Sequence, residues 1–324
     1  MNNLFSLIRK SRAGCHIDDY YAGVFGYADD LLLLCPSRDG LQKMLDIAEK
    51  YAKDHKIAFS TDINPTKSKT KGIIFTKNKM RNLPVPVYLN GNPLPWVESG
   101  KYLGNKLTST LDGFQKDAIE KRAQFIGKNV ELNQEFYLAH PVVKSRINQI
   151  YNSSFSGSML WNLQGAKTKQ VVNSWSVAVR HMWNLPLNTH KRFIEPLGGT
   201  HAQVKIYSNY IRFIQSIRKS NKMAVIYLLE KVHMNLNTTT GQNIRHILSQ
   251  AEEADIFKIK PKLFKKNFKF EKLPEEENWK VDIIKEIVDL KHNVCGLTSD
   301  DQTEPPVKFT EEELYEILSY VSTC

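Results

Sequence analysis

Two adjacent carboxylates near the start of the chain lie between two apolar runs. Asp29 and Asp30 follow residues 22–25 and precede the four leucines at 31–34. Short apolar runs of this kind are typical of packed β-strands, so the pair is expected where two buried strands reverse. Carboxylates held together beside a core repel each other and lose hydration unless a cation neutralises them. Mg²⁺ is commonly held by one or two carboxylates together with substrate phosphates, so these residues indicate phosphoryl transfer. An ordinary turn capped by its own aspartate is the alternative.

A helix and further strands are predicted to support this turn. Ser37 or Asp39 can cap a helix whose apolar residues recur at three- and four-residue spacing. These apolar residues are Leu41, Met44, Leu45, Ala48, Tyr51 and Ala52. Strand-like segments at 57–59 and 73–75 enclose a basic connector at 64–69. The predicted order is therefore strand, turn, strand, helix, strand.

Four segments then occur in an informative order: GYADDLLLL at 26–34, INPTKSKTKGIIF at 63–75, KYLG at 101–104 and GSMLW at 157–161. With them the chain resembles a reverse transcriptase of the LINE (non-LTR retrotransposon) type. The first segment is similar to the catalytic hairpin of that family, and the second to its lysine-bearing block. The third is similar to the element that grips the primer, and the fourth to a segment beyond the thumb. The resemblance implies an α+β fold, a partial polymerase palm of antiparallel sheet and packed helix, followed by an all-helical thumb and C-terminal region.

The resemblance also implies roles in the reaction. Asp29 would bind the metal, with Asp30 as its supporting neighbour, in a site that uses two Mg²⁺ ions in the complete enzyme. Lys67 matches the family lysine proposed to protonate the departing pyrophosphate, where a cation also stabilises negative charge. Lys69 and Lys71 compete for that role, and an ordinary solvated lysine is the alternative.

The nucleic-acid contacts follow in the same way. Tyr27 would precede the acidic pair at the strand end, and Tyr102 and Gly104 would hold the primer end. Glycine permits close approach of a nucleic-acid backbone, although a plain turn explains the same residues. The implied partners are an RNA template and a DNA primer, with a dNTP in the complete enzyme, and the implied activity is that of an RNA-directed DNA polymerase (a nucleotidyltransferase).

One expected part of the active site is missing. The family uses another aspartate upstream of the hairpin, and Asp18 and Asp19 are the only earlier acidic residues. An extended strand from residue 20 to 27 would place Asp19 roughly 30 Å from Asp29, so these two aspartates are expected to form a separate turn. We therefore expect a fragment, a truncated copy or the later part of a longer product, that does not polymerise DNA alone. A non-catalytic RNA- or DNA-binding remnant that uses a basic thumb is the alternative function.

The predicted divisions are a partial palm at 1–107, a helical thumb and extension at 108–235, and a basic then acidic, partly disordered tail at 236–324. Within residues 112–133 one helical face is apolar and is expected to pack, and the opposite face is polar. The apolar face comprises Ile119, Ala123, Ile126 and Val130, and the polar face comprises Asp117, Lys121, Gln124 and Lys128. Lys121 and Lys128 are candidates for contacts with the nucleic-acid backbone, with a merely solvated face as the alternative.

Composition fits a partner that carries many negative charges. The net charge of +11 and the pI near 9.3 favour nucleic acid, and no apolar run approaches the ~20 residues of a membrane-spanning helix. Cys15, Cys35, Cys295 and Cys324 show no metal or disulfide spacing, so reduced thiols, no zinc and an intracellular location in the nucleus or cytoplasm are expected.

Overall fold

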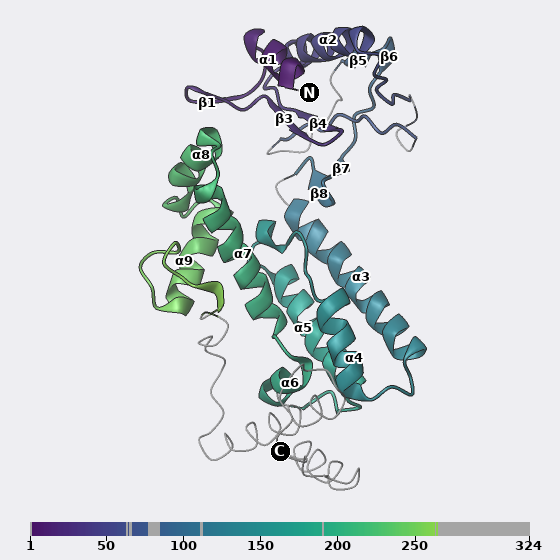
Figure 1. Cartoon of the computed structure of the whole chain (residues 1–324), viewed down its shortest axis with the longest axis vertical. Helices are drawn as coiled ribbons and strands as arrows, with labels where there is room; N and C mark the ends of the chain where they lie inside the picture. Colours follow the sequence, from purple (N-terminus) through teal and green to yellow (C-terminus); the bar gives the residue numbers. More distant parts are fainter. Residues whose placement is uncertain are drawn as a thin grey trace, which may run out of the picture. The chain divides into compact units, whose positions relative to one another are not determined.

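Helices and small antiparallel sheets make up the chain in the computed structural model, which describes residues 2–62, 64, 67–76, 85–110, 113–189, 191–262 and 264 (Figure 1). The predicted α+β class is therefore confirmed at the level of mixed helices and antiparallel sheets. Two compact units are present: Met1–Asp117 with Ser216–Thr238, and Ala118–Gln215 with Thr239–Cys324. The chain passes from the first unit to the second between Asp117 and Ala118. Most of the predicted tail, from residue 265 onward, lies outside the described residues.

The first unit begins with two helices and two hairpins. Its first elements are α1 (Asn2–Lys10), β1 (His16–Ile17), β2 (Tyr20–Tyr21), β3 (Val24–Tyr27), β4 (Asp30–Leu33) and α2 (Arg38–Asp54). Figure 1 shows α1 beside α2, and Leu4 and Ile8 of α1 are buried against Met44 and Ala48 of α2. The segment predicted as one strand from 20 to 27 is broken at Gly23, so β2 and β3 belong to separate hairpins.

Helix α2 confirms the predicted apolar periodicity. Ser37, not Asp39, caps it, since the Ser37 Oγ accepts a hydrogen bond of 3.2 Å from the amide of Gly40. Five of the six predicted apolar residues are buried, and Leu41 is half-buried.

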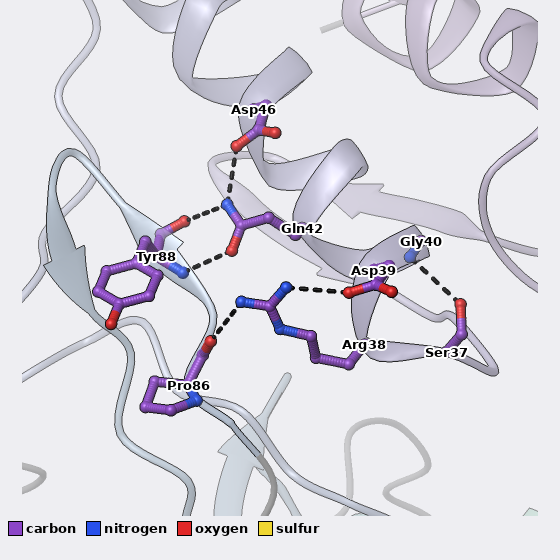
Figure 2. Close-up of polar contacts among 8 residues, drawn as sticks. All are labelled: Ser37, Arg38, Asp39, Gly40, Gln42, Asp46, Pro86 and Tyr88. Atoms are coloured by element: carbon purple, nitrogen blue, oxygen red, sulfur yellow. Dashed lines mark hydrogen bonds and ion pairs between the residues drawn. The ribbon is translucent and has the colours of Figure 1, made fainter.

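Polar side chains of α2 form hydrogen bonds with the backbone of a later strand (Figure 2). The Gln42 Nε2 donates to the Tyr88 carbonyl at 2.9 Å, while the Tyr88 amide donates to the Gln42 Oε1 at 2.7 Å. The Arg38 guanidinium donates to the Pro86 carbonyl at 2.9 Å, and the Asn90 amide donates to the Glu49 carboxylate at 2.8 Å. These contacts fix β5 (Tyr88–Leu89), which pairs with β6 (Asn92–Pro93).

The strands predicted at 57–59 and 73–75 are not formed. Their described residues adopt no strand conformation, and the nearby Gly72 makes only an isolated parallel bridge to Trp96. The next hairpin lies later, where β7 (Ser99–Tyr102) pairs with β8 (Asn105–Thr108). The first unit also includes α8 (Met223–His233).

The second unit is helical in its described part. Its elements are α4 (Pro141–Ile147), a π-helical turn η1 (Asn148–Asn152), a 3₁₀ turn η2 (Ser158–Leu160), α5 (Ala166–Met182), α6 (Lys191–Gly198) and α9 (Thr239–Ala251). Helices α3 (Gly113–Glu135) and α7 (Ala202–Lys219) contain residues of both units. Trp161, Trp175 and Trp183 are buried.

The predicted packing face of α3 is wrong. Ile119, Ile126 and Val130 are 44%, 41% and 52% exposed, whereas Asp117 is 3% exposed. The face that packs instead consists of Asp117, Ala118, Phe125, Asn129 and Leu132. Phe125 lies 5.7 Å from Phe155 between ring centroids, so tertiary partners selected this face over the more apolar stripe. None of the described helices combines the length and apolar character that crossing a membrane requires.

Candidate functional site

The acidic pair lies at the reversal of the β3–β4 hairpin, as predicted. Tyr27 pairs with Asp30, so Ala28 and Asp29 alone form the turn. Ala28 has φ of 52°, a left-handed conformation that is strained for a residue with a Cβ. Strain of this kind is common at functional sites, and here it places two carboxylates next to each other at the tip.

The burial expected for the two strands is wrong. Asp29 and Asp30 are both exposed, β3 is mostly exposed and β4 is half-buried beyond Asp30. Solvent therefore hydrates the carboxylates, and the desolvation cost expected from two buried strands is not present.

One face of the hairpin packs against α1 and α2. Val24, Leu31 and Leu33 contact the core formed by α1 and α2, and a Cβ on Gly26 would lie 2.3 Å from the Phe5 Cζ. The Phe5 ring thus lies directly on the hairpin backbone at Gly26, and a larger residue there would displace the ring. The opposite face carries Phe25, Tyr27, Asp30 and Leu32, of which Phe25 is 39% exposed and Tyr27 is 67% exposed.

A second hairpin meets this site through Asp30 and Tyr102. Burial raises the pKa of the Tyr102 hydroxyl, and the negative charge of Asp30 raises it further. The turn after Tyr102 consists of Leu103, with φ of 49°, and Gly104, with φ of 77°. A Cβ on Gly104 would meet no atom within 4 Å, so this turn has open space above it. The Asp30 carboxylate thus lies within electrostatic range of the Tyr102 hydroxyl, and both belong to the first unit.

The three candidate lysines are exposed. Lys67, Lys69 and Lys71 alternate with Ser68, which is buried and whose hydroxyl donates to the Thr70 carbonyl at 2.6 Å. Ser68 is buried, and the lysines on either side of it, Lys67 and Lys69, are exposed to solvent. Pro65 and Thr66 of the same block lie outside the described residues.

The two helical candidates differ in exposure. Lys128 is exposed on α3, whereas Lys121 is half-buried. Both belong to the second unit, while the hairpin tip belongs to the first.

The upstream aspartates form a separate turn, as predicted, between β1 and β2. Asp18 accepts hydrogen bonds from the Tyr227 hydroxyl and from the Lys231 ammonium of α8. These hydrogen bonds lower the pKa of the Asp18 carboxyl. No local signal in the sequence links residues so far apart. In the part of the chain that the structure describes, no three His, Cys, Asp or Glu side chains form a group of metal-binding size.

No known protein family and no curated protein matched this chain in comparison.

Proposed function

We propose that the first unit is the later part of a polymerase palm with its primer-gripping element, similar to the reverse transcriptases of LINE-type retrotransposons. The proposal rests on one relationship: the Tyr27-Ala28-Asp29-Asp30 turn and the Tyr102-Leu103-Gly104 turn, distant in sequence, lie close enough for the Asp30 charge to act on the Tyr102 hydroxyl. The activity would be template-directed nucleotidyl transfer from dNTP to a DNA primer on an RNA template.

The donor set at the hairpin tip fits a hard divalent cation in part. Two adjacent exposed carboxylates suit Mg²⁺, which retains several waters and takes its other ligands from phosphates. When bound there, Mg²⁺ would supply electrostatic stabilisation of phosphate charge. Asp29 and Asp30 would hold this cation, the open face with Tyr27 would lie beside the nucleic acid, and Gly104 would allow its backbone to approach Tyr102.

We further propose that this set of residues is insufficient for polymerisation by itself. A two-metal site needs carboxylates that bridge both ions. Asp18 and Asp19 are the earlier acidic candidates, and the Asp18 carboxylate is hydrogen-bonded to Tyr227 and Lys231 of α8. A primer-extension assay with Mg²⁺ and dNTP tests this point. We expect no incorporation, and incorporation that Asp29→Ala abolishes would refute it.

The metal site can be tested without activity. Mn²⁺, a paramagnetic substitute for Mg²⁺, should selectively broaden the NMR signals of residues 27–31, and Asp29→Asn with Asp30→Asn should remove that broadening. Asp54→Asn, an exposed aspartate at the end of α2, is the matched control. Broadening of other signals without those of residues 27–31 would contradict the assignment of Asp29 and Asp30 as metal ligands.

A non-catalytic role in binding RNA or DNA is the second candidate, supported by the exposed Lys128 on α3 and the net charge of +11. Fluorescence anisotropy with an RNA–DNA duplex should show salt-sensitive binding. Removing one phosphate contact with Lys128→Ala should reduce the slope of log K against log salt by about 1. Lys50→Ala, an exposed lysine of α2, is the control. Salt-sensitive binding without Mn²⁺ broadening at residues 27–31 would favour this function over the polymerase palm.

A further inference from the structure

The segment before β1 and the segment after β4 lie side by side and bring two cysteines together. The Cys15 amide donates to the Leu34 carbonyl at 2.9 Å, and the Cys15 carbonyl accepts from the Ala22 amide at 2.8 Å. Cys35 directly follows Leu34. The Cys15 backbone therefore lies directly beside the residue that precedes Cys35.

The surroundings of the two thiols also indicate that Cys15 and Cys35 lie near each other. Both cysteines are free and half-buried, and the electrostatic effect of Cys35 adds to burial in raising the pKa of the Cys15 thiol. Tyr21 interacts electrostatically with both thiols, so it lies beside the same pair. Gly40 gives the Cys35 sulfur room, since a Cβ there would lie 2.5 Å from it.

We propose that Cys15 and Cys35 form a reversible disulfide when the protein meets a hydroperoxide. Hydrogen peroxide oxidises one thiol to a sulfenic acid and releases one water. The second thiol then attacks this sulfur, forms the S–S bond and releases a second water. Two thiols and one peroxide thus give one disulfide and two waters.

The consequence is a clamp on the hairpin that carries the acidic pair. The chain between the two cysteines contains β1 to β4, with Asp29 and Asp30 at the tip of the second hairpin. A bond between residues 15 and 35 closes the base of this segment and restricts its opening. The proposal does not depend on polymerase chemistry, because it rests on the Cys15–Leu34 hydrogen bond and on the surroundings of the two thiols.

The test uses the full chain with Cys295→Ser and Cys324→Ser, which retains only the two cysteines in question. After reduction, brief peroxide treatment and alkylation, the intact mass should fall by two hydrogens with no alkyl group added, and peptide mapping should find Cys15 linked to Cys35. Dithiothreitol should restore two alkylated thiols. Hydrogen exchange at residues 24–33 should be slower in the oxidised protein.

A matched variant gives the chemistry a second readout. With Cys15→Ser added, Cys35 has no partner, so dimedone should trap a sulfenic acid that the two-cysteine protein does not accumulate. Two alkylated thiols after peroxide, stable dimedone adducts in the two-cysteine protein, or only intermolecular disulfides would each overturn the proposal.

Discussion

Gln42 acts as a strand partner for Tyr88, since its side-chain amide makes two hydrogen bonds, at 2.9 and 2.7 Å, with the carbonyl and the amide of that residue (Figure 2). A helix side chain thereby replaces a neighbouring strand, and it fixes the β5–β6 hairpin against α2. The Gln42 Nε2 also donates to the Asp46 carboxylate at 2.7 Å, which orients the amide.

Replacing Gln42 with alanine should therefore destabilise the protein by about 1–2 kcal/mol, because two hydrogen bonds are lost and each contributes roughly 0.5–1.5 kcal/mol. Chemical denaturation measures this loss. Gln124→Ala, at an exposed position on α3, should change stability little. Equal effects of the two substitutions would show that the contact with Tyr88 contributes nothing.

Gly26→Ala should destabilise the protein by about 1–3 kcal/mol, because the new Cβ overlaps the Phe5 ring and forces the α1–hairpin contact apart. Gly127→Ala is the informative control, since a Cβ there meets no atom within 4 Å and alanine should stabilise the α3 interior by roughly 0.5–1 kcal/mol. Thermal unfolding of both variants measures the difference. Combining Gly26→Ala with Phe5→Leu should recover part of the loss, and full additivity would argue against the overlap.

Asp18→Asn should loosen α8 from the β1–β2 turn at neutral pH, which hydrogen exchange of the α8 amides measures. The pKa of Asp18 is lowered in the folded protein, so its contribution is present above the ordinary value of 3.8 and is lost as pH falls through the folded pKa. Hydrogen bonding to Asp18 raises the pKa of Lys231 to about 12, so the lysine contribution is present below 10.5 and is lost as pH rises through about 12. Asp19→Asn, in the same turn, should leave α8 protection unchanged.

His246 should make stability depend on pH. Its Nε2 lies 2.8 Å from the Tyr207 hydroxyl, and burial followed by the charge of Lys169 lowers its pKa below 6.5. The unfolded chain binds more protons in that window, so the free energy of unfolding should rise as pH increases through the folded pKa towards 6.5. His246→Gln should flatten the profile below pH 6.5. His181→Gln, at an exposed position of α5, should not flatten it.

Local sequence patterns correctly predicted the elements whose formation depends on residues close to one another in the sequence. The α2 periodicity and the reversal at Asp29 are both short-range features, and both are present. The strands at 57–59 and 73–75 failed because a strand needs a partner, and an apolar run does not reveal whether one is available. The packing face predicted for α3 was wrong for a related reason. Arg122 donates a hydrogen bond of 2.7 Å to the Ser174 hydroxyl, and this distant contact helps to determine which side of α3 packs.

The candidate site divides in the same way. Adjacent carboxylates between apolar runs predicted the hairpin tip. Their exposure depends on tertiary packing, since Phe5 of α1 packs against Gly26 on one face of the hairpin. The influence of Asp30 on Tyr102 connects residues about seventy positions apart, so no spacing rule could have given it. The anchoring of Asp18 by Lys231 is more distant still.

Each sheet in the described part of the chain has two strands, so every strand leaves one row of backbone amides and carbonyls without a strand partner. Unpaired edges of this kind recruit strands from other molecules, and the exposed aromatic rings of Phe25 and Tyr27 increase that tendency. Purified at high concentration, the chain should accumulate β-rich aggregates, with the hairpin that carries the acidic pair as a point of nucleation.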